Sequence, residues 1–166
     1  MMSVAVTGAT GFVGPHLIAA LAKRGWKLRL LIRRWTPLPS LAGVEAEIVL
    51  GDLADEAALR RLVDGVDTVI HAAGLIKARA PDDFMTVNRD GTARLSALAP
   101  EARFILLSSL AAREPALSPY AASTCAAEAA VAGKAIAIRA PAVYGPGDRE
   151  TLAMLAPQHE VEWEGR

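Results

Sequence analysis

The segment Thr7-Gly8-Ala9-Thr10-Gly11-Phe12-Val13-Gly14 decides the fold, because it joins a short apolar run, residues 4–7, to an Ala- and Leu-rich segment, residues 12–24. Its glycines lie at intervals of three, GxxGxxG, rather than in the GxGxxG pattern of the standard dinucleotide fingerprint. In a strand, glycine loop and helix unit, the first glycine permits a tight turn and the second lets the backbone approach a diphosphate. The third lets the helix lie close to the sheet, and the helix N-terminus favours an anion. The segment predicts a dinucleotide phosphate site, and the alternative is a glycine-rich turn without a ligand.

The rest of the chain alternates short apolar runs with longer helical segments. The expected strands are residues 4–7, 28–32, 46–50, 68–72, 104–107 and 135–139, and the expected helices lie near residues 12–24, 56–63, 81–98 and 120–132. The strands lack polar alternation, which is typical of strands covered on both faces. Strand and helix alternation then predicts a parallel sheet with right-handed crossovers. The predicted fold class is α/β, a Rossmann-type doubly wound parallel sheet in three α/β/α layers.

The amino-acid composition excludes several classes of protein function. The chain has 166 residues, 52% hydrophobic and 22% charged, which suits one domain with a real core and argues against disorder. Eighteen basic residues offset eighteen acidic ones, so we expect neither a nucleic-acid partner nor an anionic membrane surface. Cys125 is the single cysteine, and His16, His71 and His159 form no ligand motif. No metal site is therefore expected.

The ends of the chain carry two further expectations. Residues 1–14 lack a basic segment before the first glycines, and no apolar run is long enough to cross a bilayer, so the protein is expected to be soluble and cytoplasmic. We assign residues 1–150 to the dinucleotide-binding domain. Residues 151–166 form a short tail that we expect to be poorly ordered, because it is polar and weakly patterned.

The choice of coenzyme depends on the end of the second expected strand. An acidic residue there would bind the ribose 2′-hydroxyl of NAD. Here the strand ends in Arg33 and Arg34, and an arginine can pair with a 2′-phosphate through its planar fork. We therefore expect NADP as cofactor, with NAD as the second choice, and the alternative is two solvated arginines. Asp52, after the third strand, can accept a hydrogen bond from the adenine amino group, but it fits a turn equally well.

Taken together, six ordered motifs resemble the extended short-chain dehydrogenase/reductase family, also called the NAD-dependent epimerase/dehydratase family. They are TGATGFVG at 7–14, GDL at 51–53, HAAG at 71–74, VNRDGT at 87–92, LLSSLAA at 106–112 and RAPAVYGPGD at 139–148. The resemblance covers nearly the whole chain. It implies a nicotinamide cofactor and hydride transfer on a nucleotide sugar or another carbonyl or hydroxyl substrate.

The resemblance also implies which residues contact the dinucleotide. Beside Arg33 and Arg34, the cofactor-binding set is Gly8, Thr10, Gly11, Phe12, Val13, Gly14, Asp52, Leu53, His71, Ala72, Ala73, Gly74, Asn88, Ser108, Tyr120, Pro141 and Val143. His71 suggests a catalytic base by residue type. Because it lies at a strand-end turn, we expect its side chain to be structural.

The catalytic segment departs from the family pattern. Where the family has YxxxK, this chain reads Tyr120-Ala121-Ala122-Ser123-Thr124, so Thr124 occupies the lysine position. In the family, the tyrosine exchanges a proton with the substrate oxygen and a serine, here Ser109 rather than Ser108, holds that oxygen. The lysine binds the nicotinamide ribose and favours tyrosinate. A tyrosine has a pKa near 10, and a cation within roughly 4–6 Å lowers it by about 1–3. We therefore expect activity to be absent or greatly reduced, with oxidation, which needs tyrosinate, more affected than reduction.

Other interpretations of these residues stay open. Ser108 and Ser109 also suit backbone hydrogen bonds at a strand end, and Tyr120 suits an aromatic position at a helix start. The resemblance further implies a C-terminal substrate domain, which this chain lacks, so we interpret the chain either as cut or descended from a longer one or as an atypical member. The alternative functions are a non-catalytic dinucleotide-binding sensor or assembly module, and a fragment that self-associates through a sheet edge. A homodimer packed through the helix carrying Tyr120 is also implied.

Overall fold

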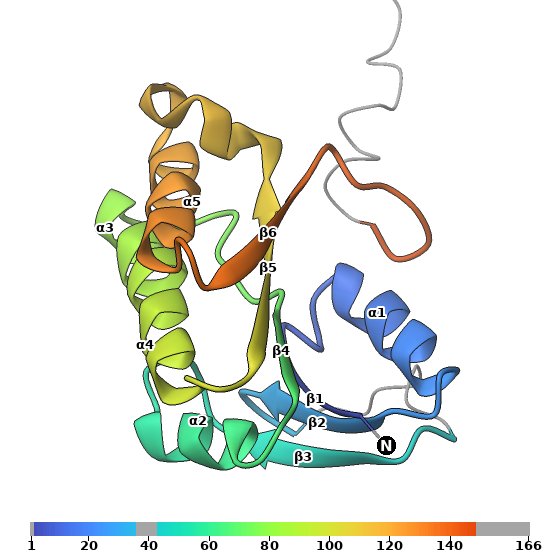
Figure 1. Cartoon of the computed structure of the whole chain (residues 1–166). Helices are drawn as coiled ribbons and strands as arrows, with labels where there is room; N and C mark the ends of the chain where they lie inside the picture. The colour runs from blue at the N-terminus through green and yellow to red at the C-terminus, as the bar shows by residue number, and fades with distance from the viewer. Residues whose placement is uncertain (1, 36–42, 149–166) are drawn as a thin grey trace, which may run out of the picture.

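A six-stranded parallel sheet organises the computed structural model, which describes residues 2–35 and 43–148 (Figure 1). The strands are β1 (Ser3–Thr7), β2 (Lys27–Ile32), β3 (Ala46–Leu50), β4 (Thr68–His71), β5 (Arg103–Ser109) and β6 (Ala135–Ala140). Their order is β3-β2-β1-β4-β5-β6, and every neighbouring pair is parallel. The order reverses between β1 and β4, the point at which open α/β sheets form a crevice. The predicted doubly wound sheet is confirmed.

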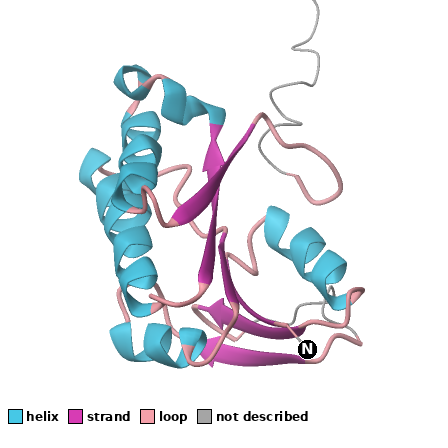
Figure 2. Cartoon of the chain, viewed as in Figure 1, coloured by secondary structure: helices cyan, strands magenta, loops and turns pink. Residues whose placement is uncertain are grey.

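Helices cover both faces of this sheet (Figure 2). The first helix, α1 (Val13–Ala22), lies on one face, and the others lie on the opposite face. These others are α2 (Glu56–Val63), α3 (Pro81–Phe84), the π-helical η2 (Met85–Asp90), α4 (Gly91–Leu98) and α5 (Pro119–Ala130), with the short 3₁₀ turns η3 (Leu110–Arg113) and η4 (Pro115–Leu117) before α5. The three-layer architecture follows.

Each face of the sheet carries its own apolar cluster. Val4, Val6 and Ile18 belong to the cluster beneath α1, whereas Ala5 and Phe104 belong to the cluster beneath α2, α4 and α5. Alternate residues of a strand point to opposite faces, so a strand covered on both sides must be apolar throughout. This is why β1 reads as a continuous apolar run.

The edge strand β6 departs from that pattern. Ile136 and Ile138 are 59% and 51% exposed, although all six strands were expected to be covered on both faces. Ile136 pairs in register with Ile105, which packs against the cluster beneath α1, so Ile136 lies on that same face. Within residues 2–35 and 43–148, α1 does not extend far enough to cover this part of the sheet (Figure 1).

The helix expected over residues 81–98 also differs, since it is divided by the π-helical turn η2. Two contacts accompany this turn. The Thr92 hydroxyl donates to the Asn88 carbonyl oxygen, and a Cβ on Gly91 would lie 2.9 Å from Leu53 Cδ1. The spacing of apolar residues along a helix carries no information on such side-chain contacts, so the π-helical turn could not be predicted from it. The tail at 151–166 lies outside the described residues.

Candidate functional site

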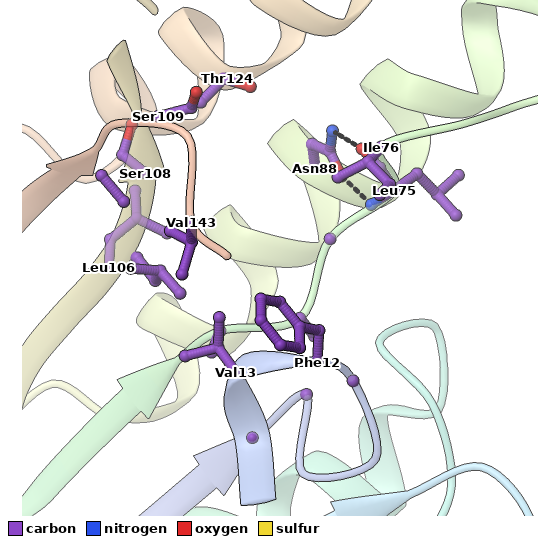
Figure 3. Close-up of a pocket in the computed structure, with 18 of the residues that line it drawn as sticks. Phe12, Val13, Leu75, Ile76, Asn88, Leu106, Ser108, Ser109, Thr124 and Val143 are labelled. Carbon is purple, nitrogen blue, oxygen red and sulfur yellow. Dashed lines mark hydrogen bonds between the residues drawn. The ribbon is translucent and has the colours of Figure 1, made fainter. Parts of the chain in front are cut away.

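A cavity of about 930 Å³ opens at the carboxyl ends of the central strands (Figure 3). Five segments line it: the glycine loop with the start of α1, the loop after β4, the η2–α4 junction with Asn88 and Thr92, the end of β5 with α5, and the loop after β6. These segments come from both halves of the sheet. The cavity therefore lies at the reversal of strand order, where ligands bind in open α/β folds.

The glycine loop is held against its neighbours by backbone contacts. Gly8 has φ +76°, and a Cβ there would lie 2.6 Å from the carbonyl carbon and oxygen of Ala72. A Cβ on Gly14 would lie 2.3 Å from Gly8 O. The Gly11 N–H donates to Gly8 O at 3.0 Å, which closes the turn. Gly8 and Gly14 are therefore sterically required, whereas Gly11 is exposed and leaves the backbone open to a ligand.

The first turn of α1 is a suitable place for an anion. No side chain caps this helix, and its first turn holds no acidic residue. Uncapped N–H groups and the positive end of the helix dipole both favour a phosphate group. The turn lies against the same cavity, because Val13 and Gly14 line it.

Asn88 clamps the loop after β4 to α5. Its Oδ1 accepts from Leu75 N at 2.7 Å, and its Nδ2 donates to Leu75 O at 3.0 Å (Figure 3). Nδ2 also donates to Ser123 Oγ at 2.9 Å. The side chain also lines the cavity. The sequence identified Asn88 as a cofactor contact but carried no signal for this bidentate clamp, because Leu75 and Ser123 come from separate elements.

His71 lies outside the cavity lining, although the resemblance placed it among the cofactor contacts. Its ring is fully buried, with Nδ1 2.6 Å from Thr7 Oγ1 and Nε2 2.9 Å from Thr92 Oγ1. The Thr92 hydroxyl hydrogen is directed at Asn88 O, so Nε2 donates to Thr92 and Nδ1 accepts from Thr7. Burial lowers the pKa of His71 to about 4. The side chain is a neutral structural group, as its position at the strand end suggested.

Ser109, Tyr120 and Thr124 all line the cavity. Tyr120 lies in the first turn of α5, which begins after Ser118 caps the Ala121 N–H at 3.1 Å. The Thr124 hydroxyl donates to Tyr120 O at 2.9 Å, so its hydrogen is directed to the backbone. Position 124 therefore presents to the cavity neither a cation nor a hydrogen-bond donor.

The two adjacent serines have different surroundings. Ser108 Oγ donates to Glu128 Oε1, and Glu128 Oε2 is paired with Arg139 Nη2 at 2.6 Å. The hydrogen bond from Arg139 holds the pKa of Glu128 below its usual range. Ser109 Oγ accepts from Ala111 N at 3.2 Å, which leaves its hydroxyl hydrogen without an acceptor in the described part of the chain. Ser109 is thus the serine able to donate into the cavity.

The residues expected at the adenosine end do not line the cavity. Arg33 and Arg34 are exposed directly after β2. Asp52 Oδ1 accepts hydrogen bonds from the backbone N–H of Ala54 at 2.8 Å and of Asp55 at 3.1 Å, which is a turn arrangement. The predicted residues that do line the cavity are Gly8, Thr10, Gly11, Phe12, Val13, Gly14, Ala72, Ala73, Gly74, Asn88, Ser108, Ser109, Tyr120, Thr124, Pro141 and Val143.

Part of the apolar lining was not predicted from the sequence. Leu75, Ile76 and Leu107 belong to it, beside the predicted Val143, and Ile76 is 60% exposed. Ile76 and Val143 project from loops on different sides of the cavity (Figure 3). Ile76 falls between the strand expected at 68–72 and the helix expected at 81–98, so an apolar residue in a predicted loop was the available sequence signal. Among the described residues, no group of three or more His, Cys, Asp or Glu side chains could hold a metal ion. None of the described helices has the length and apolar character needed to span a membrane.

Comparison with known proteins gives consistent matches. Residues 4–159 match the model of the NAD dependent epimerase/dehydratase family. The chain is 54% identical over 157 residues to a ceramide reductase from Caulobacter vibrioides, covering 92% of this chain and 50% of that protein. It is 38% identical over 96 residues to sterol demethylase protein B from Methylococcus capsulatus, covering 57% of this chain and 29% of that protein.

Solved structures agree with the fold. A short-chain dehydrogenase/reductase superfamily protein from Agrobacterium tumefaciens with bound NAD superposes with a TM-score of 0.70 at 28% identity. That match covers 84% of this chain and 48% of the other. This chain therefore spans about half the length of the Caulobacter and Agrobacterium proteins.

Proposed function

Because the chain belongs to the NAD-dependent epimerase/dehydratase family, we propose that it binds NADP, with NAD as the weaker ligand, and supports reduction of a carbonyl group on an apolar, lipid-like substrate. One observation carries the proposal. The glycine loop, with its uncapped helix start, and the Ser109 and Tyr120 pair line a single cavity. A dinucleotide can therefore have its diphosphate at one end of the cavity and its nicotinamide at the other.

The direction of the reaction follows from position 124. Reduction requires a hydride on the carbonyl carbon and a proton on the carbonyl oxygen. Tyr120 donates that proton, and Ser109 holds the oxygen by its hydroxyl hydrogen. Position 124 supplies no cation to favour tyrosinate, the form that oxidation needs, whereas reduction needs only the neutral hydroxyl. We propose that reduction is slow and that oxidation is slower still.

The substrate class is proposed from the lining and from the relatives. Leu75, Ile76 and Val143 present apolar surface to the cavity, which suits a hydrocarbon better than a sugar. The Caulobacter relative is named for reduction of a ceramide and the Methylococcus relative for a sterol, and both molecules are lipids. The chain spans 50% of the Caulobacter relative, so this proposal concerns only the part of a substrate site that the described residues line.

The preference for NADP is proposed from the end of β2. Arg33 and Arg34 are exposed there, in the place where an acidic residue would select the 2′-hydroxyl of NAD. A guanidinium can bind the 2′-phosphate by two parallel hydrogen bonds. Replacing both with serine should weaken NADPH binding and leave NADH binding nearly unchanged. Equal losses for the two coenzymes would contradict the assignment.

A second function, a non-catalytic dinucleotide-binding sensor or assembly module, is favoured by Thr124. Its hydroxyl is directed to the Tyr120 carbonyl and supplies no charge. Such a module would bind coenzyme at the same cavity and turn nothing over.

One experiment separates these functions. Calorimetric titration with NADPH, NADH and ADP measures binding, and NADPH consumption with a long-chain aliphatic ketone measures turnover, in wild type, Tyr120→Phe and Tyr144→Phe. Tyr144 is 66% exposed and does not line the cavity, so its variant is the matched control. We expect all three proteins to bind NADPH and only Tyr120→Phe to lose turnover. Binding without turnover in wild type would favour the sensor, and no binding of either coenzyme would reject both functions.

A further inference from the structure

The loop after β6, residues 141–148 and here called the β6 loop, returns across the sheet to the start of α1 (Figure 1). His16 Nε2 lies 3.0 Å from the carbonyl oxygen of Pro146, 130 positions later in the chain. A carbonyl oxygen only accepts, so His16 donates this hydrogen bond. That donor hydrogen is present both in the neutral Nε2–H tautomer and in the imidazolium, so the contact does not depend on the charge of the ring.

Two further contacts fix the geometry of this hydrogen bond. The His16 ring packs edge-on against Phe12, with ring centroids 5.9 Å apart and an interplanar angle of 81°. A Cβ on Gly147 would lie 4.0 Å from Phe12 Cδ2, so the β6 loop passes close to the same ring with room for no more than a methyl group between them. The loop also closes its own turn, since Asp148 N donates to Gly145 O at 3.0 Å. The β6 loop is therefore a formed turn that is anchored to α1 by His16, whose ring packs against Phe12.

The anchor lies beside the proposed diphosphate position. His16, Pro146, Gly147 and Asp148 line the same cavity as the glycine loop. Val143, earlier in the β6 loop, lies across the cavity from Phe12 and Val13 (Figure 3). A dinucleotide in this cavity would lie between the glycine loop and the β6 loop, so movement of the β6 loop away from α1 would widen its exit on this side.

We propose that His16 is a positioning residue that holds the β6 loop closed over bound coenzyme and so slows its release. The proposal rests on the proposed function for the presence of a dinucleotide in the cavity. Loss of one neutral hydrogen bond corresponds to about a fivefold change, which is about 1 kcal/mol. The coenzyme should therefore dissociate about five times faster when His16 cannot donate.

The test compares His16→Ala with His16→Gln, because the glutamine amide keeps a donor on a side chain of similar reach. NADPH dissociation is measured by stopped flow, by displacing bound NADPH with excess NADP and following the nicotinamide fluorescence. We expect about fivefold faster release from His16→Ala and release near the wild-type rate from His16→Gln. Equal rates in wild type and His16→Ala would overturn the proposal, and so would equally fast release from both variants.

A second measurement needs no coenzyme. Hydrogen exchange of the peptide that covers the β6 loop reports on the Asp148 amide, and His16→Ala should exchange there about fivefold faster than wild type. Unchanged exchange would overturn the anchoring itself. If wild type bound neither NADPH nor NADH, the proposed function and the retention of coenzyme would both fail, while the exchange data would still decide whether His16 holds the loop.

Discussion

The buried histidine of β4 should make the stability of this protein depend on pH well above the range of carboxyl groups. His71 has its pKa lowered by burial from 6.5 to about 4. As the pH falls below 6.5, the unfolded chain takes up a proton that the folded protein refuses. The stability that the neutral His71 allows is therefore fully present above pH 6.5, the pKa of the unfolded chain. It declines as the pH falls from 6.5 towards about 4, the pKa of the folded protein, and His71 causes no further change below that.

The magnitude follows from the two pKa values. At about pH 5, the unfolded histidine is almost fully protonated and the folded one is almost neutral, and the difference corresponds to about 2 kcal/mol of unfolding free energy. Three carboxyl groups, those of Asp67, Asp90 and Glu128, also have pKa values lowered by hydrogen bonds. Their contribution is present above the ordinary carboxyl range near 4 and is lost only below it, so they contribute little between about pH 5 and pH 7.

Urea unfolding at several values between about pH 5 and pH 7 measures this dependence in wild type and in His71→Asn. The wild-type free energy should fall by about 2 kcal/mol across the range, and the variant should show a much flatter profile. Because Thr7 and Thr92 would lose their partner geometry, the variant should also be less stable at neutral pH.

Two results would refute the reasoning. One is an equally steep profile in His71→Asn, which would assign the dependence to other groups. The other comes from wild type alone, where the ring of His71 should show no NMR titration down to about pH 5. A midpoint near 6.5 would mean that the ring is not buried as described.

Three further predictions concern the glycine loop, the lysine position and the ion pair of α5. Gly8→Ala should lower the unfolding free energy by several kcal/mol in urea titrations, whereas Gly25→Ala, at a similar φ of +69° but with nothing within 4 Å of the new Cβ, should cost only about 1–2 kcal/mol; equal losses would mean that the approach to Ala72 is unimportant. Thr124→Lys should raise the rate of alcohol oxidation by about tenfold to a thousandfold over wild type and Thr124→Met, because a cation lowers a tyrosine pKa by about 1–3; a gain with methionine would point to shape rather than charge. Glu128→Gln should cost about 1 kcal/mol of unfolding free energy, and more than Glu56→Gln, whose pair is exposed on both sides; the reverse order would contradict the structural role of the Ser108 contact.

Much of the fold could be predicted because its signals are local. The apolar runs of β1, β2 and β4 and the glycine spacing of residues 7–14 depend only on neighbouring positions. The motif order then placed Ser109, Tyr120 and Thr124 together, and they do line one cavity. Arg33, Arg34 and Asp52 remain predictions for the adenosine end.

Other features have no local signal. The interruption of the helix at residues 85–90 accompanies the close packing of Gly91 on Leu53, from a loop on another strand. The exposure of Ile136 and Ile138 depends on how far α1 extends over the sheet rather than on any property of β6 itself.

The amino-acid order alone thus determined the strand and helix alternation, the glycine turn after β1 and the absence of a lysine at position 124. Only the tertiary structure decided that Asn88 clamps Leu75 to Ser123, that His71 is neutral, and that His16 reaches Pro146. The physical reason is the separation along the chain over which each kind of interaction acts. Periodicity and glycine conformation act within a few residues, whereas a hydrogen bond between distant segments or the pKa of a buried ring depends on which surfaces the packed elements bring together.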